Sequence, residues 1–96
     1  IVPASEADPA HFQVQSFVNG QPRQDSNTND LIFDCATIVS YLSQYMTLKP
    51  GDVIFTGTPS GVILGYPEDK QVWLKAGDTV TVKIDGIGEL TNTLTK

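Results

Sequence analysis

Apolar and polar residues alternate along two stretches of this 96-residue chain. The stretches are Gln13–Val18 and Thr79–Ile84, in which valines, Phe17 and Ile84 are interleaved with polar or hydroxyl-bearing residues. Alternation with a period of two is typical of a strand whose two faces meet different surroundings. Glu89–Leu94 has leucines on one side as well. The pattern therefore predicts three strands.

Two dipeptides predict the turns beside these strands. Asn19–Gly20 is a strong hairpin signal, because both residues accept the positive φ of a type I′ turn. Asp85–Gly86 is a second such signal, with Gly88 as a candidate bulge. Pro22 cannot donate a hydrogen bond to a neighbouring strand, so the return arm is expected to be an edge or to leave the sheet quickly. Gln24–Asn29 then follows as a predicted polar loop.

The spacing of apolar residues changes to three and four over Cys35–Met46, which predicts a helix with one apolar face. Asp34 is the expected N-cap and Asp30 the alternative. Pro50 prevents the helix from extending further. Cys35 is expected to be a small buried hydrophobic residue, with a reactive thiol as the alternative.

The centre of the chain, Lys49–Gly61, joins an apolar run to a series of small residues. Val53–Phe55 is wholly apolar and β-prone, which favours a short strand buried on both faces. Small and hydroxyl-bearing side chains replace the bulky ones in Thr56–Gly61. Gly57 and Gly61 would let a ligand approach the backbone. The alternative is a strand followed by an ordinary turn rich in glycine and proline.

One local pattern occurs twice, in Leu48–Ile54 and again in Leu74–Val80. Two copies are too few for a repeat architecture, so we interpret them as one turn that launches a strand at each place. The predicted elements together indicate an α+β fold with a mostly antiparallel sheet and one helix packed on the strands.

The net charge is −5, with eleven acidic residues and six scattered basic ones. Such a chain is not expected to bind nucleic acid or an anionic membrane. No apolar run is long enough to span a bilayer. A single cysteine excludes a disulfide framework and fits a reducing cytoplasm, which is the expected location. The first residue is Ile1 rather than Met, which suggests a piece of a longer protein.

Groups that could carry chemistry are few. His11 is the only histidine and is expected to be a surface or structural residue. No catalytic triad and no metal-binding spacing is present, so neither a catalytic residue nor a metal ligand is predicted within the chain. The hydroxyls of Thr56 and Thr58 remain, and either could hydrogen-bond an anion or a carboxylate.

Several segments of the chain resemble the C-terminal part of the catalytic domain of the fumarylacetoacetate hydrolase family, which includes acylpyruvases and 2-hydroxyhepta-2,4-diene-1,7-dioate isomerases. The similar segments span nearly the whole chain: Val18–Gly20, Gln24, Leu31–Phe33, Leu48–Val62, Trp73–Asp78 and Gly86–Asn92. The resemblance implies a mixed β-sheet roll, usually in a homodimer. It also implies an enzyme that needs Mg²⁺ or Mn²⁺ and acts on 2-oxo or enolisable dicarboxylic acids by hydrolysis of a C–C bond, decarboxylation or isomerisation of a 2-hydroxydienedioate.

The resemblance also implies roles for two residues. Thr58 matches a threonine that helps to hold the substrate carboxylate, and Gly57 matches a glycine that lets the backbone come close. The family's metal-binding Glu-x-Glu pair, its further Asp, its catalytic Lys and its His–Glu lid pair all lie upstream of the matched segment. No Glu-x-Glu occurs here. Residues 1–96 are therefore expected to be the C-terminal portion of one catalytic domain, inactive and without a bound cation when alone.

Two functions from different classes remain open for this chain. The first is a fragment of a divalent-metal-dependent enzyme, with a small 2-oxo acid or dicarboxylate as its substrate and partner. The second is a stand-alone β-rich binding or scaffold module without catalysis. The Thr56–Pro59 run favours the enzyme, whereas the missing metal ligands favour the module for this polypeptide alone.

Overall fold

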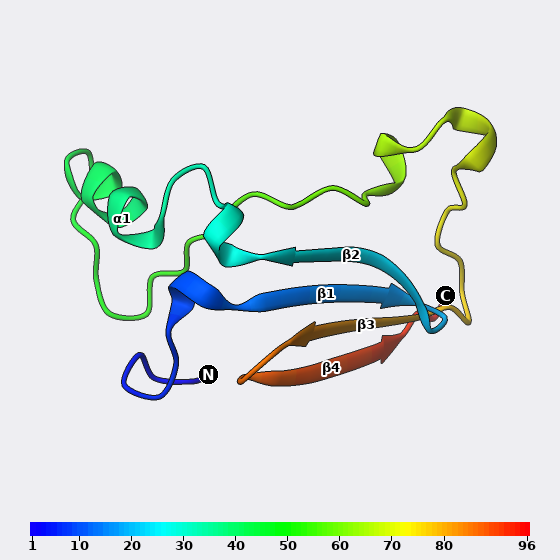
Figure 1. The fold of residues 1–96 in the computed structure, drawn as a ribbon, viewed down its shortest axis with the longest axis horizontal. Coiled ribbons are helices and arrows are strands. Elements are labelled where there is room, and N and C mark those ends of the chain that lie inside the picture. The colour runs from blue at the N-terminus through cyan, green and yellow to red at the C-terminus, as the bar shows by residue number, and fades with distance from the viewer.

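A single antiparallel sheet organises the computed structural model, which describes all residues 1–96 (Figure 1). Its strands are β1 (Gln13–Val18), β2 (Gln21–Asn27), β3 (Thr79–Ile84) and β4 (Gly88–Thr93). They lie in the order β2-β1-β3-β4, and each neighbouring pair is antiparallel. The α+β class and the three predicted strands are confirmed, with β4 shifted by one residue.

The two hairpins form where the dipeptides predict them. Asn19 and Gly20 have φ angles of 51° and 77°, as a type I′ turn requires. The turn between β3 and β4 passes through Gly86, whose φ is 79°. No register shift occurs between β3 and β4, so the bulge expected at Gly88 is not found there. The irregularity lies instead between β1 and β2, where Arg23 is the extra residue.

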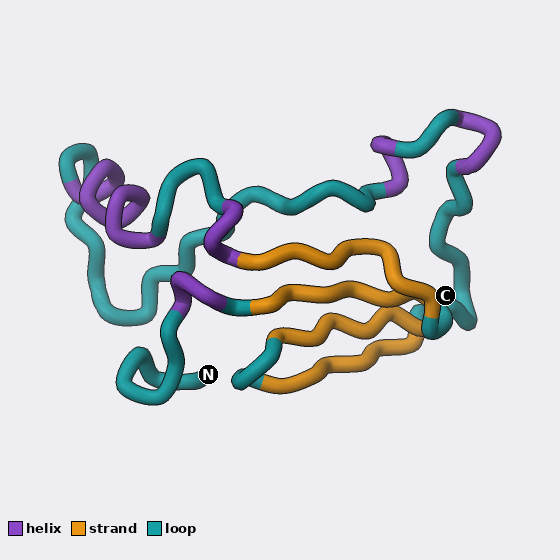
Figure 2. The backbone as a smooth tube through the Cα atoms, viewed as in Figure 1, coloured by secondary structure: helices purple, strands orange, loops and turns teal.

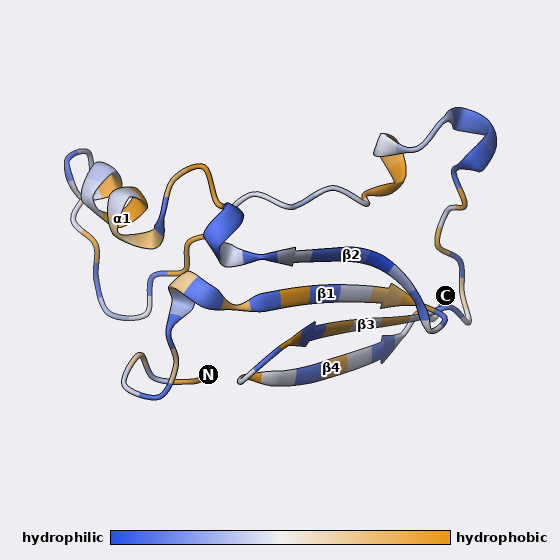
Figure 3. Cartoon of the chain, in the orientation of Figure 1, coloured by the Kyte–Doolittle hydropathy of each residue, from blue (hydrophilic) through white to orange (hydrophobic).

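β2 is longer than its composition predicts. The prediction of a polar loop at Gln24–Asn29 is wrong, because the strand continues to Asn27 and a 3₁₀ helix, η2 (Thr28–Asp30), follows. Its polar side chains are compatible with a strand because β2 is an edge of the sheet, as Pro22 predicts (Figure 3). The bulge at Arg23 separates Pro22 from the regular pairing that follows.

The predicted helix is α1 (Cys35–Ser43), which ends three residues earlier than expected. Asp34 is the N-cap, since its Oδ1 accepts a 2.7 Å hydrogen bond from the Thr37 backbone N–H. Cys35 is exposed at the first helical position, so the prediction that it is buried is wrong. No residue of α1 is buried, and the helix lies beyond one end of the sheet rather than on its face (Figure 1). The expected packing of the helix on the strands is thus absent.

The repeated turn adopts the same geometry twice. Asp52 Oδ2 accepts a 2.8 Å hydrogen bond from the Lys49 N–H, and Asp78 Oδ2 accepts one of 2.9 Å from the Lys75 N–H. The glycines before these acids, Gly51 and Gly77, have φ angles of 94° and 93°. Only the second turn leads into a strand, β3.

The predicted strand at Val53–Phe55 is not formed. Residues 47–78 run as loops (Figure 2), interrupted only by the 3₁₀ helices η3 (Ile63–Gly65) and η4 (Glu68–Lys70); a further one, η1 (Pro9–His11), precedes β1. No residue from 53 to 60 makes a backbone–backbone hydrogen bond. A strand requires a partner strand, and none lies beside this segment.

The chain buries no hydrophobic residue, and Asp78 is its only buried residue. Its accessible surface is 7713 Å², whereas a compact monomer of this mass exposes about 5,400 Å². The radius of gyration is 15.9 Å, compared with about 12.5 Å for a compact domain of this length. Phe55 and Ile32 are 94% and 91% exposed. Residues 1–96 therefore do not form a hydrophobic core of their own.

None of the helices has the length and apolarity that crossing a membrane requires.

Candidate functional site

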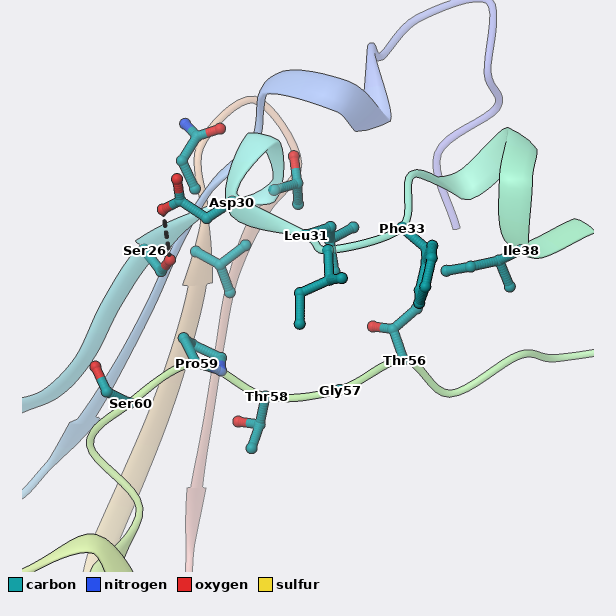
Figure 4. A pocket seen from close by; sticks show the side chains of 14 residues that line it. Ser26, Asp30, Leu31, Phe33, Ile38, Thr56, Gly57, Thr58, Pro59 and Ser60 are labelled. Carbon is teal, nitrogen blue, oxygen red and sulfur yellow. Dashed lines mark hydrogen bonds between the residues drawn. The ribbon is translucent and has the colours of Figure 1, made fainter.

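A cavity of about 600 Å³ opens between one end of the sheet and the segment Thr56–Ser60 (Figure 4). This volume lies within the roughly 300–1,000 Å³ of small-molecule pockets. Leu31, Phe33 and Ile38 supply apolar side chains on the far side from that segment. The segment itself supplies hydroxyls and backbone groups, so the cavity combines an apolar wall with a polar one.

The two threonines of this segment present their hydroxyls to different sides. Thr56 points toward Phe33 and into the cavity, whereas Thr58 points away from Leu31 on the other side of the chain (Figure 4). Gly57 separates them, and a Cβ atom added at Gly57 would meet nothing within 4 Å. A ligand therefore has open access to the backbone at Gly57.

A glutamine of β2 holds the segment in place. Gln24 Nε2 donates a 2.7 Å hydrogen bond to Thr58 Oγ1 and another of 3.0 Å to the Pro59 carbonyl. On its other end, Gln24 Oε1 accepts a 3.2 Å hydrogen bond from Ser16 Oγ of β1. The Thr58 hydroxyl is thus tied to two strands of the sheet through one side chain.

Gly61 brings the end of the segment against β2. A Cβ atom at this position would lie 1.9 Å from the Arg23 carbonyl oxygen, and the φ of Gly61 is +107°. Both facts favour glycine, the first because there is no space for a side chain and the second because L residues rarely adopt such a φ. The close approach that we expected a ligand to make at Gly61 is made by the β2 backbone.

Acidic residues do not converge at the cavity. Asp30 is the only carboxylate that lines it, and Asp30 Oδ2 accepts a 3.1 Å hydrogen bond from Ser26 Oγ. No group of three or more His, Cys, Asp or Glu residues could hold a metal ion. Mg²⁺ and Mn²⁺ prefer several oxygen ligands, carboxylates among them. The residues present here do not fit such an ion.

A second polar network lies away from the cavity, around Asp78. Asn19 Nδ2 donates a 3.0 Å hydrogen bond to Asp78 Oδ1, and Lys75 Nζ lies 3.0 Å from the same oxygen. The hydrogen bond from Asn19 and those from Lys75 lower the pKa of Asp78 from 3.8 to about 2. This network connects the β1–β2 hairpin to the start of β3 and has a structural role.

Two other carboxylates have a lowered pKa, and both are exposed and hydrogen-bonded to near neighbours in the chain. The Thr37 backbone N–H lowers the pKa of its N-cap, Asp34. A hydrogen bond from His11 lowers the pKa of Asp8, and the two side chains are 2.8 Å apart. His11 is on the surface, as the sequence predicts.

Comparison with known proteins identifies the family. The sequence model for the fumarylacetoacetate hydrolase C-terminal region matches residues 1–95. The chain belongs to this family. It is 45% identical over 86 residues to a fumarylacetoacetate hydrolase domain-containing protein 2 homolog of Dictyostelium discoideum, covering 88% of this chain and 28% of that protein. It is 44% identical over 86 residues to a 4-hydroxyphenylacetate degradation bifunctional isomerase/decarboxylase of Salmonella dublin, covering 90% of this chain and 18% of that protein.

A solved structure of a family member with bound ligands has the same fold. The fumarylpyruvate hydrolase of Pseudomonas aeruginosa in complex with Mn²⁺ and pyruvate superposes with a TM-score of 0.82 at 38% identity. The match covers 97% of this chain and 36% of that one. This chain thus spans about a third or less of the family members it matches.

The structure brings Thr58 together with a residue that sequence reasoning did not assign to the site. Gln24 lies 34 positions away from Thr58 in the chain. Gln24 is one of the residues that resemble the family, and this could have indicated a role in the site. The sequence pattern, however, predicted that Gln24 lies in a polar loop. Gly57 and Thr58 lie in one extended segment, and both are accessible.

Proposed function

We propose that residues 1–96 are the C-terminal portion of a single catalytic domain of the fumarylacetoacetate hydrolase type. The protein that carries them is then a divalent-metal-dependent enzyme acting on 2-oxo or enolisable dicarboxylic acids. The match of the family over residues 1–95 is the observation that carries this proposal. Relatives that are named as hydrolases, isomerases and decarboxylases support the range of reactions.

Within this enzyme we assign Thr56–Pro59 to the substrate site. The Thr58 hydroxyl, on the side of the segment that faces away from the cavity, donates a hydrogen bond to a substrate carboxylate, and the open backbone at Gly57 lets the substrate approach closely. A hydroxyl donor suits a carboxylate, which only accepts hydrogen bonds. The pyruvate bound to the Pseudomonas aeruginosa hydrolase is a 2-oxo acid and supports this class of substrate.

We assign the cation to another part of the protein, because the residues described here do not form a ligand set. Mn²⁺ in the Pseudomonas aeruginosa structure supports a divalent ion, with Mg²⁺ as the other candidate. The exposed apolar side chains of this chain, Phe55 and Ile32 among them, would then be covered by the same upstream portion. A homodimer and a cytoplasmic location complete the proposed enzyme.

A comparison of two proteins tests this function: residues 1–96 alone and the complete protein encoded with them. Metal binding is measured by calorimetry with Mg²⁺ and Mn²⁺, and turnover by oxaloacetate decay and acylpyruvate hydrolysis. We expect weak metal binding and no turnover for the isolated chain. We expect turnover for the complete protein that a chelator abolishes and Mn²⁺ restores.

Each of two results would contradict the proposal. Micromolar metal affinity in residues 1–96 alone would show that the ligand set is not elsewhere. A complete protein without metal-dependent turnover or pyruvate binding would favour the stand-alone binding or scaffold module instead.

A further inference from the structure

We propose that Gln24 is a positioning residue that makes the Thr58 hydroxyl a hydrogen-bond donor toward the substrate carboxylate, an inference that rests on the proposed function above. Gln24 is on β2, whereas Thr58 is in the loop segment Thr56–Ser60. The side chain of Gln24 joins the two.

The Pro59 carbonyl determines the orientation of the Gln24 amide. A carbonyl oxygen can only accept, so the group 3.0 Å from it must be the Nε2 end of the amide. Oε1 is then the end that faces Ser16, and the Ser16 hydroxyl must donate the 3.2 Å hydrogen bond between them. The reverse orientation would place two acceptors against each other at Pro59. The amide therefore has one satisfactory orientation.

This orientation determines the direction of the Thr58 hydroxyl. Gln24 Nε2 has two hydrogens, and one of them is directed to Thr58 Oγ1 at 2.7 Å. Oγ1 is an acceptor in this contact, so its own hydrogen must point elsewhere. Thr58 is exposed, and a substrate carboxylate can take that hydrogen. A hydroxyl without this contact could instead turn its hydrogen toward the protein.

The sheet holds Gln24 in this position. Gln24 pairs with Ser16 in the β1–β2 register, directly after the bulge at Arg23. Gly61 packs against the Arg23 carbonyl and so brings the loop segment down onto the same stretch of β2. The bulge and the glycine place Thr58 within reach of a side chain that is itself fixed at both ends.

The test uses Gln24→Glu in the complete protein, because glutamate keeps the size of the side chain but only accepts when ionised. Thr58 would then donate to the new carboxylate and lose its donor to the substrate. We expect Kd for pyruvate in the presence of Mn²⁺, and KM, to rise by about tenfold or more, with a smaller change in kcat. Gln21→Glu is the matched control, since it adds the same charge on the same strand but its side chain hydrogen-bonds to Arg23 rather than to Thr58.

A double-mutant cycle separates positioning from structural support and from charge. Gln24→Met removes the amide without adding a charge, and its effect on Kd for pyruvate should disappear when Thr58 is already Val. Thr58→Ser, which keeps the hydroxyl, should restore the sensitivity to Gln24→Met. Melting temperatures of all variants show whether each is folded.

Three results would overturn the inference. One is an active wild type whose Gln24→Glu variant has unchanged Kd and KM, which leaves the proposed function intact. Another is an undiminished effect of Gln24→Met when Thr58 is Val, which would show that Gln24 acts independently of Thr58. An inactive wild type that does not bind pyruvate would overturn the proposed function as well. If Gln24→Met does not fold, Gln24→Glu and its Gln21→Glu control decide the question alone.

Discussion

Asn19 and Asp78 are 59 positions apart in the chain, yet their side chains share a 3.0 Å hydrogen bond. Asn19 Oδ1 also accepts a 2.9 Å hydrogen bond from the Thr79 backbone N–H. One amide therefore connects the β1–β2 hairpin to the residues that open β3. Asp78 is 6% exposed and is the only buried residue of the chain. The best-enclosed point of this structure is thus a polar contact between two turns.

Stability should depend on the ionisation of Asp78. Its pKa is about 2 when folded, compared with an ordinary value of 3.8, so the folded state favours the charged form. The contribution of Asp78 to stability is complete above the ordinary value and is lost as the pH falls through about 2. Urea unfolding of the complete protein should show that the free energy of unfolding falls as the pH is lowered from about 4 to about 2. The fall should be smaller in Asp78→Asn.

Asp52 provides the control for that experiment. It sits in the same turn geometry but has no counterpart of Asn19. At neutral pH, Asp78→Asn should lower the urea midpoint more than Asp52→Asn does. Equal losses in the two variants would mean that the contact between the turns adds nothing to stability.

Gly61→Ala should be strongly destabilising. The added Cβ would meet the Arg23 carbonyl oxygen at 1.9 Å, and the φ of +107° is unfavourable for alanine. We expect a loss of about 2–4 kcal/mol in the free energy of unfolding, from overpacking together with backbone strain. Denaturant unfolding of the complete protein measures it.

Gly51→Ala isolates the strain from the clash. Gly51 also has a positive φ, 94°, but its Cβ would meet nothing within 4 Å. The expected loss is about 1–2 kcal/mol, from the backbone conformation alone. Equal losses of stability in Gly61→Ala and Gly51→Ala would show that the contact of Gly61 with β2 adds no constraint.

Thr58→Val should impair the enzyme without destabilising it. A hydrogen bond from a hydroxyl to a carboxylate contributes about 1.5–3 kcal/mol, so kcat/KM should fall by roughly one to two orders of magnitude. Valine keeps the branched shape, and Gln24 Nε2 retains the Pro59 carbonyl as a partner. Thr93→Val on β4 is the control for a threonine far from the loop. Unchanged kinetics in Thr58→Val would assign Thr58 to the turn alone.

The segment Val53–Phe55 should gain a strand partner in the complete protein. It is apolar and exposed here, and its backbone groups make no backbone hydrogen bonds. Buried backbone groups are nearly always paired, so a partner strand is the expected way to cover this segment. Amide hydrogen exchange should be slow at residues 53–55 in the complete protein and fast in residues 1–96 alone. Fast exchange in both would show that the segment remains a loop.

Features that depend on near neighbours in the chain are the ones that the sequence predicts well. Alternation identifies β1 and β3 almost residue for residue, and Asn19–Gly20 identifies the hairpin. Asp34 is recognised as an N-cap because its partner, the Thr37 N–H, is only three residues away. In each case the backbone preference and the stabilising contact lie in one short segment, so local chemistry is sufficient.

Other features depend on where distant segments come to lie, and only the tertiary structure decided them. β2 continues through polar residues because β1 offers it a partner, whereas Val53–Phe55 is no strand because this chain offers it none. The pairing of Gln24 with Thr58 spans 34 positions. Strand formation and side-chain contacts of this kind require two distant segments to associate, and the free energy of their association cannot be predicted from either segment alone.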